Sequence, residues 1–257
     1  MTILQRCNIK ITIAYLGKQF SGWQTQKTGH RTVQGKIEKA LRTIFRRRVK
    51  LIGAGRTDSG VHAMAQVANF QIKSSKALGK VKNALNGNLD DDIAILKIEY
   101  VPLSFHAQYS AKSKIYCYTI LNRKERCVFS QNIAWHFPYT LNLHLMRQAA
   151  NLLKGRKDFC SFQSSYQGHL LEENKKRSTI RTVQRIEIRK RGDFVDITIE
   201  ADGFLYKMAR NIVGILLAVG RGRLTNFDVK HILEQKKTGI VRQTAKAKGL
   251  RLVEVKY

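Results

Sequence analysis

Apolar side chains recur with two different periods along the chain. Residues 8–13 alternate between polar and apolar side chains, which is the pattern of a strand with one buried face. Between Val33 and Ile44 the apolar positions are spaced three and four residues apart, which predicts a helix, and Thr32 is placed to cap its start. The same patterns predict further strands at residues 49–54, 66–72 and 93–101 and a second helix at residues 78–85.

These elements follow the order β-α-β-β-α-β, which is the split βαβ or ferredoxin-like arrangement. The second half of the chain repeats this order, with strands predicted at residues 114–121, 182–188, 194–201 and 250–256 and helices at 141–153, 206–219 and 227–233. The sequence therefore predicts an α+β fold with two ferredoxin-like (βαββαβ) halves, residues 1–104 and 105–257. We expect mainly antiparallel sheets that flank a central active-site cleft, because clefts are where sites form.

The charge of the chain points to a polyanionic partner. Lys and Arg total 47 against 18 Asp and Glu, which leaves a net charge of +29. A charge of this size repels itself in a compact chain and suits phosphate neutralisation, so nucleic acid is the expected partner. No stretch reaches the roughly 18 apolar residues of a membrane-spanning helix, so we expect no membrane partner. The candidate phosphate contacts are Arg46-Arg47-Arg48, Lys175-Lys176-Arg177, Arg189-Lys190-Arg191 and Arg221 with Arg223.

The cysteines and histidines do not indicate a metal or redox site. Cys7, Cys117, Cys127 and Cys160 are far apart, with no paired spacing that suits zinc or a dithiol. The seven histidines are equally scattered. We therefore expect reduced thiols in a cytoplasmic protein, and no metal. The alternating N-terminal residues also lack the charged and apolar blocks of a secretion signal.

One predicted loop combines a guanidinium and a carboxylate. It connects two predicted strands and contains Arg56-Thr57-Asp58-Ser59-Gly60. Thr-Asp-Ser-Gly is common turn chemistry, so Asp58 could simply shape the loop. A dinucleotide-binding fingerprint fails here, because Asp58 stands where the third glycine is required and would repel a pyrophosphate. In a chain this basic, Arg56 could instead position a ribose-phosphate while the carboxylate reaches a carbon of the nucleotide.

A series of motifs spread over nearly the whole chain resembles the tRNA pseudouridine synthase A family. The match starts at Tyr15-Leu16-Gly17 and Phe20-Ser21-Gly22-Trp23-Gln24 and is strongest at Gly55-Arg56-Thr57-Asp58-Ser59-Gly60-Val61-His62-Ala63. It continues through Phe105-His106-Ala107, Tyr116-Cys117-Tyr118, Met208-Ala209-Arg210-Asn211 and Gly249-Leu250. An ordered series of this extent favours the catalytic interpretation of Asp58.

The resemblance implies a cofactor-free isomerase that detaches uracil from C1′ of a uridine, rotates it and rejoins it through C5. It assigns Asp58 as the nucleophile, Arg210 as the cation that keeps this carboxylate ionised, and Tyr116 as a residue that stacks on the base and acts near the C5 proton. Whether the carboxylate attacks C1′ or C6, or assists elimination through a glycal, stays open. Taken alone, Arg210 also suits the surface of an amphipathic helix, and Tyr116 suits ordinary core packing.

The resemblance also implies a substrate and an assembly. The substrate is the anticodon stem-loop of tRNA, at positions 38, 39 and 40, and the enzyme is a homodimer. The implied substrate-binding residues are Tyr116, Arg56, Arg210, Leu250 and Gln108. Three positions depart from the family pattern: Lys246 replaces a usual proline, Lys157 a common histidine, and Gln108 an arginine that is a probable RNA contact.

Other functions fit part of the sequence. Ferredoxin-like sheets also serve as RNA platforms, so a non-catalytic RNA-binding protein would explain the charge, although no aromatic strand signature of such a platform is present. A pseudouridine synthase that acts on another structured RNA fits the same motifs. A ribosome-associated structural protein would explain the charge but not the loop with Arg56 and Asp58.

Overall fold

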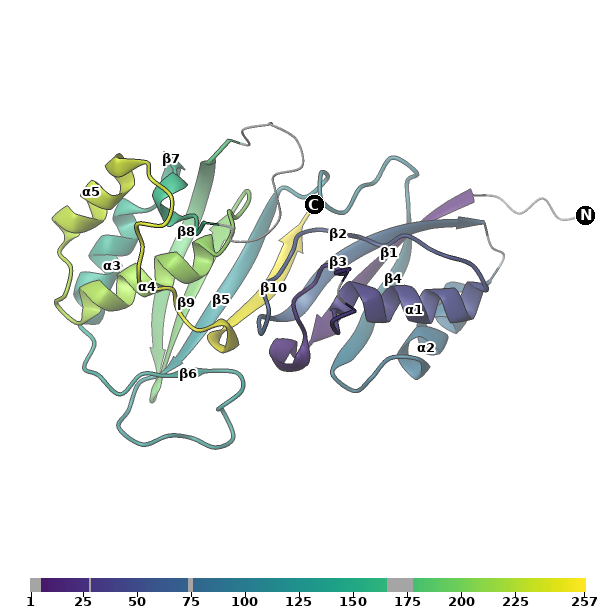
Figure 1. Ribbon diagram of the computed structural model, residues 1–257, viewed down its shortest axis with the longest axis horizontal. Coiled ribbons are helices and arrows are strands. Elements are labelled where there is room, and N and C mark those ends of the chain that lie inside the picture. Colours follow the sequence, from purple (N-terminus) through teal and green to yellow (C-terminus); the bar gives the residue numbers. More distant parts are fainter. Residues whose placement is uncertain (1–5, 28, 74–75, 166–177) are drawn as a thin grey trace, which may run out of the picture. The chain divides into compact units, whose positions relative to one another are not determined.

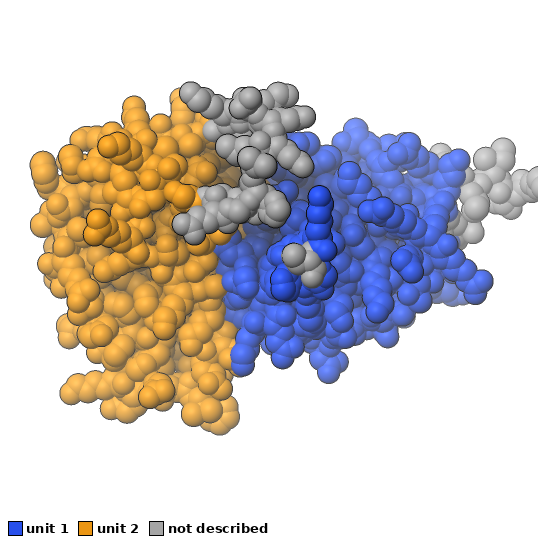
Figure 2. Space-filling view, viewed as in Figure 1, with its two compact units in different colours: residues 1–112, 251–257 blue, residues 113–250 orange. Residues whose placement is uncertain are grey.

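The computed structural model describes residues 6–27, 29–73, 76–165 and 178–257 of the 257-residue chain (Figure 1). The chain forms two compact units, which we call unit 1, residues 1–112 with 251–257, and unit 2, residues 113–250 (Figure 2). The first unit thus extends past the predicted boundary at residue 104 and includes the end of the chain. Helices and mostly antiparallel strands are mixed along the sequence, so the predicted α+β class is confirmed.

Unit 1 has the predicted order β-α-β-β-α-β. Its elements are β1 (Arg6–Tyr15), the 3₁₀ turn η1 (Gly17–Gln19), α1 (Val33–Phe45), β2 (Ile52–Gly53), β3 (His62–Lys73), α2 (Leu78–Gly87) and β4 (Ile93–Val101). The antiparallel strands lie in the order β4-β1-β3, and β2 pairs with β3. The last strand, β10 (Leu250–Lys256), adds a short parallel pairing to the start of β3.

The core of unit 1 lies between its sheet and its two helices. Ile9, Ile11 and Ile13 are buried on one face of β1, as the alternation predicts. The helix α1 buries Ile37, and the Thr32 side chain accepts a hydrogen bond from a backbone N–H of its first turn, so the predicted cap is confirmed. Figure 1 shows α1 and α2 in front of these strands, and α2 contacts β4.

The strand predicted at residues 49–54 is much shorter in the structure. Leu51 is buried, but its backbone N–H donates to the Glu38 carboxylate and its carbonyl accepts from the Gln34 amide. Both partners are side chains of α1, so the backbone of Leu51 is satisfied without a neighbouring strand. Ile52–Gly53 pairs with β3, and the Ala54 N–H donates to the Val67 carbonyl of β3 at 2.7 Å. The alternation therefore predicted the burial of Leu51 correctly. It did not predict that side chains of α1, and not a neighbouring strand, bind the backbone of this residue.

Unit 2 contains mostly antiparallel strands and three helices among its described residues. Its elements are β5 (Ser113–Leu121), β6 (Trp135–His136), α3 (Leu143–Leu152), β7 (Gly155–Asp158), η2 (Cys160–Phe162), β8 (Ile180–Arg191), β9 (Phe194–Ala201), α4 (Met208–Gly220), α5 (Asn226–Gln235) and η3 (Ala247–Gly249). The sheet order is β5-β9-β8-β7, and β6 pairs parallel to β5. The strands β6 and β7 are too short to show a period, so the sequence did not predict them.

The helix α4 is the buried centre of unit 2. All of its residues except Arg210 are buried, and α3 contacts it from one side. A Cβ on Gly214 would lie 1.6 Å from the Gln243 carbonyl oxygen, so glycine allows the following segment to cross the helix closely. Within the described ranges, no helix has both the length and the apolar content needed to cross a bilayer.

Candidate active site

The loop that carries Arg56 and Asp58 is anchored by hydrogen bonds on its N-terminal side. The Gly55 carbonyl accepts from the Gln66 amide at 3.0 Å. The Thr57 carbonyl accepts from the Trp23 backbone N–H at 3.1 Å, and the Thr57 hydroxyl lies 2.8 Å from the Tyr15 hydroxyl. Thr57 is therefore held through both its backbone and its side chain, directly before Asp58.

The C-terminal side of the same loop is a tight turn. The Val61 backbone N–H donates to the Asp58 carbonyl at 3.1 Å, and the Ser59 hydroxyl donates to the Phe20 carbonyl at 3.1 Å. Gly60 has a φ of 79°, a conformation that favours glycine. The turn interpretation of Thr-Asp-Ser-Gly is thus correct for the backbone.

Side chains of the loop alternate between the interior and the surface. Thr57 is 6% exposed, whereas Arg56 is exposed and Asp58 is partly exposed. Burial raises the pKa of the supporting Tyr15 hydroxyl to about 12. Tyr15 therefore stays neutral near physiological pH and keeps its hydrogen bond to Thr57. The loop presents a guanidinium and a carboxylate on a fixed backbone.

Two glycines of the N-terminal motifs fit directly against this loop. A Cβ on Gly22, whose φ is 91°, would lie 2.7 Å from the Thr57 carbonyl oxygen. A Cβ on Gly17 would lie 2.0 Å from the Val61 carbonyl oxygen, and the Gly17 N–H donates to Nδ1 of His62 at 2.9 Å. The motifs around residues 15–24 therefore build the support of the loop. Sequence reasoning did not assign this role, because contacts between distant segments leave no local period.

Tyr116 occupies a buried position on β5 of unit 2. Its side chain is 7% exposed, and its ring packs edge-on against Phe204 with the ring centroids 4.9 Å apart. The interplanar angle of 80° is a favourable geometry for two aromatic rings. Phe204 thus restricts the plane of the Tyr116 ring.

Arg210 is the exception on an otherwise buried helix. Its Nε donates to the Ala245 carbonyl at 2.8 Å, and the Ala245 N–H donates to the Arg210 carbonyl at 3.1 Å. The Tyr118 hydroxyl donates to the next carbonyl, that of Lys246, at 2.7 Å. Burial raises the pKa of Tyr118, and the charge of Arg210 opposes this shift. The α4 helix is not amphipathic, so the interpretation of Arg210 as a residue of a polar helix face is wrong.

The remaining predicted substrate-binding residues occupy two different settings. Leu250 is 4% exposed at the start of β10. Gln108 is exposed in the loop after β4, where its N–H donates to Nδ1 of His106 at 3.2 Å. Unit 1 thus contains Arg56, Asp58 and Gln108, whereas unit 2 contains Tyr116, Arg210 and Leu250.

Among the described residues, some of the predicted phosphate contacts already form ion pairs within the protein, and others do not. Arg189 donates to Glu187 at 2.8 Å, and Nε of Arg191 donates to Asp196 at 2.9 Å. Arg221 instead lies over the Tyr139 ring, 3.7 Å from its centroid, which holds the guanidinium in place without cancelling its charge. The cluster Lys175-Lys176-Arg177 lies outside the described residues.

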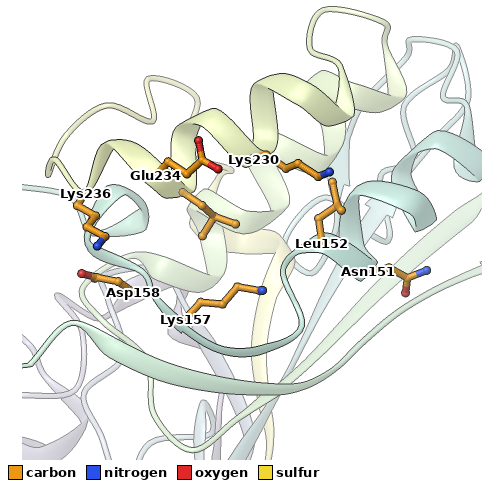
Figure 3. Close-up of a pocket in the computed structure, with 8 residues that line it drawn as sticks. Asn151, Leu152, Lys157, Asp158, Lys230, Glu234 and Lys236 are labelled. Carbon is orange, nitrogen blue, oxygen red and sulfur yellow. The ribbon is translucent and has the colours of Figure 1, made fainter.

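A pocket of about 450 Å³ in unit 2 contains none of the predicted site residues. Its lining residues are Asn151, Leu152, Lys157, Asp158, Lys230, Leu233, Glu234 and Lys236. Figure 3 shows Lys236 with Asp158 at one end and Lys230 with Leu152 at the other. The Asp158 carboxylate accepts from the Thr179 hydroxyl at 2.6 Å and from the Cys160 N–H at 3.0 Å. Mixed charges make this pocket a weaker anion site than its lysines alone would suggest.

The described residues contain no cluster of three or more His, Cys, Asp or Glu side chains that could hold a metal ion. All four cysteines are free thiols.

Comparison with known proteins identifies the family. The family model described as tRNA pseudouridine synthase matches residues 11–110 and 149–257. The tRNA pseudouridine synthase A of Thermoanaerobacter sp. (strain X514) is 44% identical over 253 residues, which cover 97% of this chain and 99% of that protein. The tRNA pseudouridine synthase A of Thermodesulfovibrio yellowstonii (strain ATCC 51303 / DSM 11347 / YP87) is 41% identical over 257 residues, with the same coverage of both chains.

A solved structure titled as a Cbf5-Nop10-Gar1 complex aligns with 95% of this chain at 12% identity and a TM-score of 0.35, and the chain spans 57% of the aligned protein's length. The family match covers most of the sequence, and the relatives match it almost from end to end. The chain therefore belongs to the tRNA pseudouridine synthase family, and it is an isomerase that converts uridine in tRNA to pseudouridine.

Proposed function

We propose that this enzyme modifies uridines at positions 38, 39 and 40 of the tRNA anticodon stem-loop and that Asp58 is its nucleophile. The observation that carries the proposal is the anchoring of Thr57. Its carbonyl and its hydroxyl are both hydrogen-bonded, to Trp23 and Tyr15, immediately before the partly exposed Asp58. A nucleophile requires this combination of a fixed backbone and an accessible side chain.

The reaction assigns a defined task to the carboxylate. Attack at C1′ forms a carbon–oxygen bond to Asp58 while the bond between C1′ and N1 of uracil breaks, and the electron pair leaves with the uracil. The rotated base then bonds to C1′ through C5, which releases the carboxylate, and loss of the C5 proton restores the aromatic base. Attack at C6 and elimination through a glycal place the same carboxylate at the same nucleotide.

We assign Arg210 and Tyr116 to the same reaction. Arg210 is the one residue of α4 that is not buried, and the hydrogen bond from its Nε to the Ala245 carbonyl holds the guanidinium in place. It supplies the cation that favours an ionised carboxylate. Tyr116 has a ring plane set by Phe204, and it stacks on the uracil and acts near the C5 proton.

The stem-loop substrate fits the charge of the chain. A uridine in a stem reaches a carboxylate only after it swings out, which costs a few kcal/mol of unstacking and unpairing. Phosphate contacts from a chain with a net charge of +29 offset this cost. We further propose a homodimer that grips the tRNA, in the cytoplasm, where the four free thiols stay reduced.

The test is to map pseudouridines in tRNA incubated with the purified protein and with Asp58→Asn. We expect modification at positions 38 to 40 with the unchanged protein, and none with Asp58→Asn, which keeps its affinity for tRNA. Asp91→Asn is the matched control, because Asp91 is an exposed aspartate of unit 1. Tritium release from C5-labelled tRNA by Asp58→Asn at the normal rate would exclude the nucleophile. Modification at other positions only would favour a different structured RNA as substrate.

A further inference from the structure

The loop between β4 and β5 can be followed in Figure 1. It contains Tyr109, an aromatic residue that the catalytic proposal does not use. Tyr109 is 80% exposed. Its ring stacks on the His106 ring, with the centroids 4.3 Å apart and the planes inclined by 27°. One face of the Tyr109 ring is therefore supported by the imidazole, and most of the remaining surface faces solvent.

The imidazole beneath Tyr109 is fixed by the backbone of its own loop. Nδ1 of His106 accepts hydrogen bonds from the Gln108 N–H at 3.2 Å and from the Tyr109 N–H at 3.3 Å. The His106 N–H donates to the Ser110 hydroxyl at 3.1 Å, and the Ser110 N–H donates to the His106 carbonyl at 2.9 Å. Because Nδ1 is an acceptor, a neutral His106 carries its proton on Nε2.

Two buried amides hold the loop to the sheet of unit 1. Asn8 and Asn69 are each 1% exposed, and Nδ2 of Asn69 donates to Oδ1 of Asn8 at 2.9 Å. Oδ1 of Asn69 accepts from the Ala107 backbone N–H at 2.9 Å, and Nδ2 of Asn8 donates to the Phe105 backbone carbonyl at 2.8 Å. Buried amides are costly unless they are satisfied, and here their hydrogen bonds serve to fix one surface loop.

Tyr257 also contacts this loop, through a hydrogen bond and a ring contact. The Tyr257 hydroxyl donates to the Ala107 carbonyl at 2.8 Å. The Tyr257 ring packs against Phe105 with the centroids 4.9 Å apart, and the Lys10 ammonium lies 5.2 Å from the centre of the Tyr257 ring. The loop that presents Tyr109 is therefore rigid before any ligand binds.

We propose that Tyr109, supported by His106, is a stacking platform for an unpaired base of the bound tRNA. An exposed ring on a rigid loop loses little conformational entropy when it binds, and a base can stack on it whatever its sequence. The neighbouring Gln108 carries no charge, so the contact that we propose at Tyr109 depends on the ring itself. This inference rests on the proposed tRNA substrate and adds a binding residue outside the catalytic loop.

The test compares the tRNA affinity of Tyr109→Ala and Tyr109→Phe with that of the unchanged protein. We expect Tyr109→Ala to weaken tRNA binding by roughly 5- to 150-fold, the range for removal of one base–aromatic stack, and Tyr109→Phe to keep the affinity. Tyr100→Ala is the matched control, because Tyr100 is also an exposed tyrosine of unit 1 and should tolerate the change. The dependence of affinity on salt should stay the same in all variants, since each of them keeps every positive charge of the chain.

Three outcomes would overturn the platform. Unchanged affinity of Tyr109→Ala would show that the ring does not touch tRNA. An equal weakening in Tyr109→Phe would assign the interaction to the hydroxyl. An equal weakening for a fully paired RNA duplex would exclude an unpaired base as the ligand. Failure of the catalytic proposal can be distinguished from failure of the platform. The first would appear as turnover by Asp58→Asn, and the second as an unexpected affinity of the Tyr109 variants.

Discussion

At the scale of single residues, the hydroxyl pair of Tyr15 and Thr57 links the strand β1 to the loop that contains Asp58. The two oxygens lie 2.8 Å apart, and both residues are buried. The pair belongs to unit 1, as does Asp58. The position of the Asp58 backbone therefore depends on a hydrogen bond between two neighbouring buried side chains.

We predict that Thr57→Val slows turnover more than it weakens binding. The change removes the hydroxyl and costs about 1 kcal/mol of folding free energy, the usual value for one hydrogen bond. A small shift of the neighbouring carboxylate can slow the reaction by up to about 100-fold. Single-turnover rates and tRNA affinity measured together test this, with Thr43→Val, at an exposed threonine of α1, as the matched control. A normal rate in Thr57→Val would show that the hydroxyl does not position Asp58.

The same pair predicts a pH dependence of stability. Burial raises the pKa of Tyr15 from 10.0 to about 12, so the folded state holds the phenol proton more tightly than the unfolded chain does. The stability from this group is complete below pH 10.0 and is lost as pH rises toward about 12. A shift of this size corresponds to a decrease on the order of 2 to 3 kcal/mol.

Tyr15→Phe isolates this contribution, because phenylalanine does not titrate. We expect the unfolding free energy of the unchanged protein to fall toward that of Tyr15→Phe as the pH rises from about 9 to about 11.5. Urea unfolding at a series of pH values measures both. Parallel curves over this range would contradict the prediction, since the titration of lysines is common to both proteins.

At the scale of elements, the segment between α5 and β10 is held by two side chains of unit 2. Arg210 bonds the Ala245 carbonyl and Tyr118 bonds the Lys246 carbonyl. Lys246 stands where the resemblance implies a proline, and its φ of −61° is close to the fixed φ of proline. The segment thus adopts a proline-like backbone without a proline ring.

We predict that Lys246→Pro stabilises the protein by about 0.4 to 1 kcal/mol, because proline restricts the unfolded chain at a position whose folded φ it already matches. No acceptor among the described residues uses the Lys246 N–H, so its removal costs no hydrogen bond there. Thermal unfolding measures the effect, and Lys246→Ala separates removal of the side chain from the gain in rigidity. A lower melting temperature in Lys246→Pro than in Lys246→Ala would contradict the proline-like backbone.

Elements with a clear period were predictable, and those formed by distant partners were not. The strands β4, β9 and β10 begin and end at the predicted residues. The strand β3 starts at His62, ahead of the predicted residue 66, because its first residues pair with β10. The helix α3 begins after Asn142, whose side chain caps it, a signal that the apolar spacing did not contain.

The candidate site divides in the same way. Local sequence alone left Asp58 open as a simple turn residue, and the family resemblance led to its prediction as the nucleophile. The support of its loop was not predicted. Tyr15, Gly22 and Trp23 are remote in sequence from Thr57, and their contacts with it depend on how the strands and loops fold together. A motif can mark such residues as unusual, but only the folded structure shows which neighbour they hold.

At the scale of the whole molecule, several of the few acidic residues form ion pairs with basic ones. Lys36 and Arg31 hold the pKa of Asp90 at about 2, well below its usual range. Glu99 contacts Lys10 at 2.7 Å, and its pKa is lowered by hydrogen bonds to Lys10 and Lys97. The excess of 47 basic over 18 acidic residues nonetheless leaves many cations without an acidic partner in the chain. These cations are available to phosphates.

We predict that tRNA affinity falls steeply as the salt concentration rises. We also predict that Arg223 and Arg189 contribute differently to this salt dependence. Arg223 is exposed and forms no ion pair with a described residue, whereas Arg189 already donates to Glu187 at 2.8 Å. Both changes, Arg223→Gln and Arg189→Gln, remove one positive charge from the chain. If Arg223 binds a phosphate, Arg223→Gln lowers the slope of log affinity against log salt by about one, because fewer counterions are released on binding.

Arg189→Gln should leave that slope nearly unchanged, because a guanidinium paired with a carboxylate releases few counterions when RNA binds. Affinity measured at a series of salt concentrations distinguishes specific phosphate contacts from a diffuse effect of net charge. Equal changes of slope in the two variants would show that total charge alone attracts the tRNA. A change confined to Arg223→Gln would place the RNA backbone at the end of α4, where Arg221 is held by Tyr139.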